Sequence, residues 1–333
     1  MCGPAMTTYQ TMDEAVTDAA AWPGAPADTR GAAAEPAAAW FDWLTWPALV
    51  GAALAATAAL LPRMSATAVT VVVTVGVGVV LLALERVRPQ RARTPRAPSL
   101  VGELGHVLAG AELGTLLGYG GAVLLGLALT AVRGDGVPWP TAWPAAIQIV
   151  VGLVVADIVS YGQHRAFHRV GALWRFHALH HQPRGLDVVK TGRFHVVDFA
   201  SATFAAYLPL VALGAPPAVM AWIAVVNAIG GLLQHANVRM PTPAWLDALV
   251  CTPAAHWRHH SRAAADDGNY ATICMLVDRA FGTWVPTQGR RPRELGLAND
   301  PLPPGWLASL LAPFRPGRGR AVDGQAPDRP SPG

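Results

Sequence analysis

The chain has 333 residues, of which 52% are hydrophobic and only 14% are charged, and its formal net charge is +4. This charged fraction is low for a soluble globular protein. The 24 arginines and the single lysine lie in loops between long apolar runs, which is typical of membrane proteins and argues against a nucleic-acid-binding protein.

The first 42 residues contain much alanine, proline and threonine and six acidic residues against one basic residue, Arg30. A signal peptide would begin with a charged stretch followed by an apolar core and a cleavage site, and this pattern is missing here. We therefore expect residues 1–42 to be a disordered segment.

Two uncharged apolar runs follow, at residues 43–61 (after Asp42) and 67–84. Each is long enough to cross a hydrocarbon core of about 30 Å, and the five residues between them predict a helical hairpin. Residues 85–96 then carry five arginines (Arg86, Arg88, Arg91, Arg93 and Arg96). Arginine-rich loops stay on the cytoplasmic side, so this loop orients the hairpin.

The next two apolar runs are residues 113–132 and 143–161. Glycines in the first of them allow close packing of helices, and the loop 133–142 between them has balanced charge and is expected outside. Residues 197–213 and 217–233 form a second apolar hairpin, which brings His235 back to the cytoplasmic face. The remainder, from residue 236 on, should fold on the cytoplasmic surface.

The predicted fold is therefore all-α: a polytopic membrane bundle of about six spans with a cytoplasmic, histidine-rich cap. We expect a multi-pass protein of the cell inner membrane with both termini in the cytoplasm. The expected parts are a disordered N-terminal segment (1–42), a transmembrane hairpin with its basic loop (43–100), a catalytic domain (101–290) and a partly disordered C-terminal tail (291–333).

Ten of the eleven histidines lie between positions 164 and 260, as one HxxxH, two HxxHH clusters and two single residues. Imidazole is the commonest metal ligand and suits iron, zinc and copper. Residues three and four apart share one face of a helix, so each cluster aims several ring nitrogens at one point. The candidate ligands are His164, His168, His177, His180, His181, His195, His235, His256, His259 and His260. His195 is either a ligand or a residue that only braces its loop through Arg193 and Asp198.

One HxxxH pair on an apolar helix is usually only a hydrogen-bonded pair, but the repeated HxxHH favours metal binding. The clustered histidines are too many for one ion, so the pattern predicts two adjacent ions. The predicted topology puts every cluster on the same side of the membrane, as a shared centre requires. The sequence contains no HExxH motif, which removes support for a zinc protease.

Asp157 and Tyr161 share a helical stripe with His164 and His168, since they are spaced by four, three and four residues. A carboxylate inside a membrane span is costly and by default functional. We expect Asp157 to accept a hydrogen bond from a metal-bound histidine and so to fix its tautomer. The alternative is an aspartate that pairs with an arginine or faces water.

The histidine pattern resembles the fatty acid hydroxylase/sterol desaturase superfamily of integral membrane di-iron enzymes, over roughly residues 145–285. The motifs that carry the resemblance are HRxxH from His164, HxxHH from His177, RFH from Arg193, QHAN from Gln234, TPxxHxxHHS from Thr252, and NY at Asn269 with DRxFGT from Asp278. The chain departs from the family where His195-Val-Val-Asp198 replaces the frequent His-Pro-x-Glu, and at Trp257, where a basic residue is common.

The resemblance implies two iron ions that activate O2 to hydroxylate or desaturate a fatty-acyl or sterol-like membrane lipid. We expect Asp157, Tyr161 and Asn237 to be the catalytic residues beside the metal ligands. Zinc is expected to compete with iron during purification, because zinc binds such sites more tightly than ferrous iron. The sequence has no dinucleotide-binding or iron–sulfur motif of its own. An external ferredoxin or cytochrome-type electron donor is therefore implied.

Two other functions are also compatible with the sequence. One is a carotenoid-type ring hydroxylase, although that family tends to wider spacings in its first and third histidine boxes. The other is a membrane protein without enzymatic activity that binds zinc structurally or carries metal. A transporter would place its ligands near the middle of the bilayer, whereas these histidines are expected at one surface.

Overall fold

The structure is a computed structural model, and it describes residues 38–92, 100–134, 138–287, 291–292, 294–297, 302–303 and 305–315. Most of the N-terminal segment, Arg93 and Arg96 of the basic loop, and most of the C-terminal tail lie outside these ranges, so the predictions made for them stay untested. The described part is helical, and its β-structure is limited to three isolated bridges. This confirms the all-α fold class.

Five of the described helices are long and apolar enough to cross a membrane. They are α1 (Trp40–Leu60), α2 (Ala66–Val87), the continuous run Val101–Arg133, α5 (Ala145–Arg169) and α8 (Pro217–His235). The sixth predicted span corresponds to α7 (Val196–Ala212), an apolar helix of 17 residues that is shorter than the others. The structure thus gives five full-length candidate spans and one shorter apolar helix.

The run Val101–Arg133 contains three elements: α3 (Leu100–His106), a π-helical turn η1 (Val107–Glu112) and α4 (Leu113–Arg133). Small residues let α4 lie directly against α7. A Cβ on Gly114 or Gly118 would lie within 3 Å of atoms of α7, and a Cβ on Gly110 would meet the carbonyl oxygen of Phe194. The predicted role in close helix packing is thus confirmed for Gly114 and Gly118, whereas a Cβ on Gly120 would meet nothing within 4 Å.

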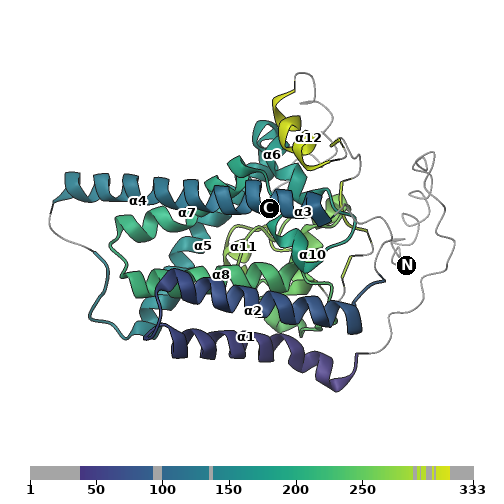
Figure 1. Ribbon diagram of the computed structural model, residues 1–333, viewed down its shortest axis with the longest axis horizontal. Coiled ribbons are helices and arrows are strands. Elements are labelled where there is room, and N and C mark those ends of the chain that lie inside the picture. Colours follow the sequence, from purple (N-terminus) through teal and green to yellow (C-terminus); the bar gives the residue numbers. More distant parts are fainter. Residues whose placement is uncertain are drawn as a thin grey trace, which may run out of the picture. The chain divides into compact units, whose positions relative to one another are not determined.

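The α1–α2 hairpin packs on α8 through a stripe of side chains on α2. Val69, Val73, Val77 and Leu81 are spaced by four residues, share one helix face, and belong to one buried cluster with residues of α8. A second cluster joins α5, α7 and α8 around Leu210. The long helices therefore lie side by side in the order α4, α7, α5, α8, α2 and α1, as Figure 1 shows.

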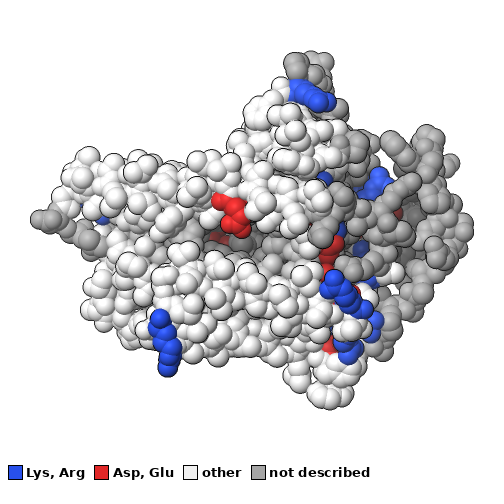
Figure 2. All heavy atoms as spheres, in the orientation of Figure 1, with Lys and Arg blue, Asp and Glu red and all other residues white. Residues whose placement is uncertain are grey.

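Short helices cover one end of this bundle. They are α6 (Gly171–His181), η2 (Val188–Gly192), α9 (Ala244–Asp247), α10 (Pro253–His259), η3 (Ala264–Asp266), α11 (Met275–Ala280), α12 (Trp306–Leu311) and η4 (Ala312–Phe314). Figure 2 shows that the bundle surface on the visible face is almost free of charge and that most of its basic side chains gather at this end. The long helices therefore suit a bilayer, and the capped end suits water.

Candidate metal centre

The histidines come from four helices that meet at the capped end of the bundle. His164 and His168 lie in the last turns of α5, and His235 is the last residue of α8. α6 starts two residues after α5 and carries the first HxxHH cluster, while α10 carries most of the second. Thr252 caps α10 by accepting the N–H of Ala255, which fixes where the second cluster begins.

Nine of the ten candidate ligands form two groups, and within each group the ring nitrogens that face a common point lie within 4.8 Å of one another. The first group is His164, His168, His177, His181 and His259, and the second is His180, His235, His256 and His260. Both HxxHH clusters contribute to both groups. Consecutive residues of a helix point about 100° apart, so the paired histidines of each cluster reach different groups.

In five of these rings, Nδ1 donates a hydrogen bond to an oxygen atom, which is a backbone carbonyl in four of them and the Asp198 carboxylate in the fifth. Nδ1 of His164 lies 2.7 Å from the Tyr270 carbonyl, that of His259 lies 2.8 Å from the Gly268 carbonyl, and that of His235 lies 2.9 Å from the Gly231 carbonyl. His180 has a longer contact of 3.3 Å to the Arg193 carbonyl. A carbonyl only accepts, so each Nδ1 carries the proton and each Nε2 is left with a lone pair.

Two pairs of these Nε2 atoms face each other without a proton between them. The distance is 3.0 Å for His164 and His177 in the first group and 3.3 Å for His180 and His235 in the second. Two ligands at about 2.0–2.1 Å from one ion lie about 3 Å apart at the angles of common coordination geometries. The facing lone pairs repel each other unless a cation lies between them, so the residues fit one metal ion per group.

Three further ring nitrogens support the same conclusion. Within the described part of the chain, both nitrogens of His168 and Nε2 of His259 are buried without a hydrogen-bond partner. An unsatisfied buried polar atom is costly, and metal binding removes that cost. Burial lowers the pKa of His259 to about 3, and it also lowers the pKa of His180, His181, His256 and His260 well below the usual value. The rings are therefore neutral, as metal ligands must be.

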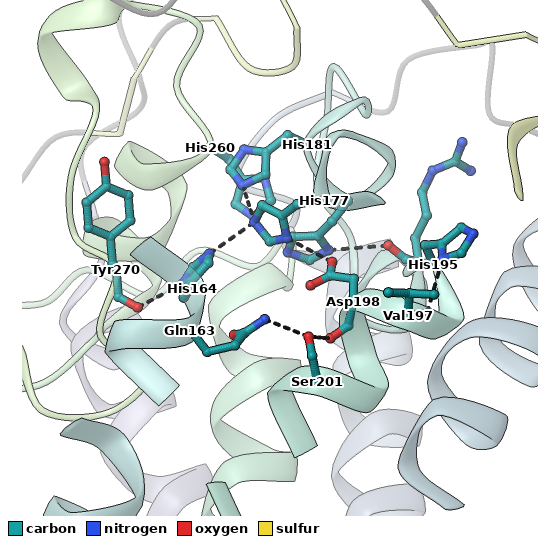
Figure 3. Close-up of polar contacts among 12 residues, drawn as sticks. Gln163, His164, His177, His181, His195, Val197, Asp198, Ser201, His260 and Tyr270 are labelled. Atoms are coloured by element: carbon teal, nitrogen blue, oxygen red, sulfur yellow. Dashed lines mark hydrogen bonds and ion pairs between the residues drawn. The ribbon is translucent and has the colours of Figure 1, made fainter. Parts of the chain in front are cut away.

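Asp198 is the carboxylate that touches this centre. Its Oδ2 lies 2.8 Å from Nδ1 of His177, and both side chains are almost fully buried (Figure 3). Asp198 lies in the first turn of α7, where a negative charge is favourable. A carboxylate partner fixes the ring of a ligand and raises its basicity. The sequence identified this residue only as a departure from the family pattern.

His195 is the predicted ligand that the structure does not bring to either group. Its Nδ1 accepts the N–H of Val197 at 3.1 Å, so it caps α7, and its Nε2 donates to the carbonyl of Leu310 at 3.1 Å. Figure 3 shows the ring directed away from His177. Because both nitrogens are engaged elsewhere, His195 belongs to neither histidine group in the structure, and its contacts are those of a helix-capping residue.

Asp157 does not contact a histidine either, contrary to our expectation. Its Oδ1 accepts the N–H groups of Thr272 and Ile273, at 2.8 and 3.1 Å, and its Oδ2 accepts that of Cys274 at 2.6 Å. Asp157 does share one face of α5 with the histidines, as predicted, but its side chain contacts the segment before α11. Asp157 therefore anchors this segment to the membrane bundle.

Tyr161 and Asn237, the other two candidate catalytic residues, also make structural contacts. The hydroxyl of Tyr161 bonds to Thr283 at 3.0 Å and its ring stacks on Phe281. The side chain of Asn237 exchanges two hydrogen bonds with the backbone of Arg91, each of 3.0 Å, which ties the loop after α2 to the end of α8. Neither side chain belongs to the two histidine groups.

The contacts that support His180 of the second group were not predicted from the sequence. The ring of Phe194 stacks on His180 with centroids 4.0 Å apart, and the neighbouring carbonyl of Arg193 contacts Nδ1 of the same histidine. Arg193 in turn forms a buried ion pair with Glu103 of α3, at 2.9 Å. The partners are separated by 90 residues, so no local pattern could have predicted the contact.

The sequence is similar to several known proteins. Residues 149–283 match the family model described as fatty acid hydroxylase. The chain is 40% identical over 191 residues to ornithine lipid hydroxylase OlsE of Rhizobium tropici, which covers 57% of each protein. It is 33% identical over 152 residues to alkylglycerol monooxygenase of Danio rerio, covering 45% of this chain and 32% of the relative.

A fungal relative, fatty acid hydroxylase vlmA of Lecanicillium, is 26% identical over 157 residues, covering 42% of this chain and 43% of the relative. The chain thus spans less than two thirds of the length of each of these relatives. No solved structure matches it significantly.

Proposed function

We propose that this chain, whose residues 149–283 match the fatty acid hydroxylase family model, is a membrane-embedded, iron-dependent lipid hydroxylase. The observation that carries the proposal is the pair of histidine groups whose facing Nε2 atoms have no proton between them. Imidazole ligands suit iron, and two bound iron ions would supply the activation of O2 that attack on an unreactive C–H bond needs.

The protein's own part in this chemistry is to hold the ligands and keep water away. Carbonyl oxygens and Asp198 fix five of the nine rings in the tautomer that presents Nε2. The groups lie at the capped ends of α5 and α8, and eight of the nine histidines are buried. A buried centre beside the bilayer suits an apolar substrate that arrives from the lipid phase.

The proposed reaction is hydroxylation of a long-chain lipid. The three relatives are named as hydroxylases or monooxygenases, and the compounds in their names are an ornithine lipid, an alkylglycerol and a fatty acid. One oxygen atom of O2 enters the C–H bond, and the other leaves as water after taking up two protons. An external ferredoxin or cytochrome-type protein supplies the two electrons that this balance requires.

We further propose that the metal centre faces the cytoplasm of an inner-membrane protein with six spans. All four ligand-bearing helices meet at one end of the bundle, and the arginines after α2 mark that end as cytoplasmic. The short helix α7 then serves as the fifth span in chain order. Residues 101–290 form the catalytic domain on this view, with the hairpin of residues 43–100 as a membrane anchor beside it.

Topology reporters test the orientation directly. Fusions after Pro89, Gly136 and Pro216 are expected to read inside, outside and outside. Gly136 lies outside the described residues, and its position follows from the sequence alone. A fusion after Pro89 that reads outside would overturn the cytoplasmic placement of the metal centre.

The decisive experiment compares host lipids with and without the active chain. Cells that express the wild type, the variant His180→Ala or no protein are grown under isotopically labelled O2, and their lipids are analysed by mass spectrometry. We expect lipids that gained one labelled oxygen atom only with the wild type. Bound iron is measured on the same preparations.

Products that have lost two hydrogens without gaining oxygen would indicate a desaturase instead. Tightly bound zinc with unchanged lipids, even when iron and a donor are supplied, would indicate a structural metal protein. An oxygenated carotenoid ring as the labelled product would favour the carotenoid-type reaction. Each outcome differs from the one that the proposal predicts.

A further inference from the structure

The C-terminal helical segment α12–η4 turns an apolar face outward. Leu307, Leu311 and Phe314 are 55%, 50% and 63% exposed, and Trp306 is exposed as well. The opposite face carries Ser309 and Ala312, which are buried. The segment ends at Arg315. In water this face would be a costly apolar patch, so a partner is to be expected.

This segment is attached to the long helix that contains α4. The ring of Trp306 lies against Gly105 of α3, where an added Cβ would come within 2.8 Å of it, and Ser309 contacts Nε2 of His106 at 3.4 Å. The helix α12 packs on α3, and Figure 1 shows it above α6, on the flank of the bundle near the end that the short helices cover. The segment is therefore held on the side of the molecule rather than on the tip of the cap.

The helix that carries it also continues past the bilayer core. The 21 residues of α4 span about 31 Å, which fills a core of about 30 Å. The exposed carboxylate of Glu112 then marks the boundary, and α3 enters the headgroup layer. Yet Val101, Leu104 and Leu108 beyond this boundary are large, apolar and exposed, like the lipid-facing residues of α4.

We propose that α12–η4 and the outer face of α3 form a membrane-interface element, whose partner is the headgroup–acyl boundary of the bilayer. Three observations favour lipid over another protein. The apolar face is continuous with the lipid-facing surface of a membrane span, it combines tryptophan, leucine and phenylalanine, and it ends at a basic residue, as interfacial helices do. The proposal rests on the membrane placement of α4 and is independent of the reaction.

The same segment reaches the metal centre through a short chain of contacts. The carbonyl of Leu310 accepts Nε2–H of His195, and the ring of Phe314 packs on Phe176 and His195. His195 caps α7, whose first turn carries Asp198, the partner of His177. Through these contacts, the segment at the membrane supports the first turn of α7 and so the orientation of His177. His195 is therefore a positioning residue.

Spin labels at exposed positions test the proposal without disturbing the core. Leu307→Cys and Leu311→Cys are labelled in a background with Cys2→Ser and Cys274→Ser, since Cys251 is buried. Protein in lipid nanodiscs is then probed by the accessibility of each label to O2, which concentrates in the bilayer, and to a water-soluble nickel chelate. Leu124→Cys on the exposed face of α4 and Ala264→Cys in the cap are the lipid and water references.

We expect the labels at 307 and 311 to report a depth between the two references, with O2 accessibility above that of the nickel chelate. Adding Leu311→Glu should shift the label at 307 toward the water reference. Labels at 307 that match the Ala264→Cys reference would overturn the proposal, as would labels that neither probe reaches, because a protein partner would then cover them. Bound metal, measured on each preparation, reports folding separately from depth.

Discussion

Two sets of histidines in this protein share burial but differ in the direction of their ring nitrogens. His180 and His259 are 3% and 4% exposed, and His195 and His106 are 2% and 1% exposed. The first two direct Nε2 toward other histidines, whereas His195 directs both nitrogens at backbone groups and His106 contacts Ser309. The comparison shows that convergence of lone pairs distinguishes the proposed metal ligands from the other buried histidines, and that burial or a neighbouring motif does not.

The largest effect is expected from removing a converging ring. His180→Ala and His259→Ala each delete one ligand of a different group, and a two-metal reaction needs both ions. We expect no measurable turnover and a fall in bound metal from about two ions per chain toward about one. Metal analysis and the lipid assay check this. Wild-type activity and metal content in either variant would refute the metal centre.

An intermediate effect is expected at the carboxylate that orients His177. Asp198→Asn keeps the size of the side chain but removes its charge, and loss of such a partner typically costs about 10–100-fold in metal affinity or activity. Titration of metal into chelator-treated protein, together with turnover, measures the loss. Ser201→Ala is the matched control, since Ser201 bonds only to the backbone carbonyl of Asp198 and to Gln163. Equal behaviour of the two variants would show that the charge of Asp198 is irrelevant.

Asp157→Asn separates an anchoring role from a role in metal binding. An amide group cannot accept three backbone N–H bonds in the place of a carboxylate, so one buried donor loses its partner. The expected cost is about 1–3 kcal/mol of stability, with about two ions still bound and turnover per bound metal unchanged. Thermal unfolding and metal analysis report the two quantities. A selective loss of metal at unchanged stability would restore the role first expected for Asp157.

The smallest effects are expected from histidines outside the two groups. His195→Ala removes a helix cap, which costs about 0.5–2 kcal/mol, and His195→Asn should recover most of it because asparagine caps helices well. Both variants should retain full metal content. His106→Ala should stay active as well. Loss of one ion in His195→Ala that His195→Asn does not recover would place this residue among the ligands after all.

Much of this architecture is contained in the sequence. Apolar runs of sufficient length predicted the membrane helices, because a bilayer core accepts little else. The spacing of the HxxxH and HxxHH clusters predicted that several rings share one helix face, which depends only on helix geometry. Five of the six predicted spans are full-length helices in the structure, whereas α7, at 17 residues, is shorter than its neighbours.

The tertiary structure decided what each polar side chain touches. His180 and His181 are adjacent in the sequence, yet they join different groups, because their partners come from α8 and α10 for one and from α5 and α10 for the other. Asp198 rather than Asp157 meets a ligand, and His195 turns away, through contacts that span 21, 115 and 115 residues. Spacing fixes the face of one helix, but only packing between helices fixes what that face meets.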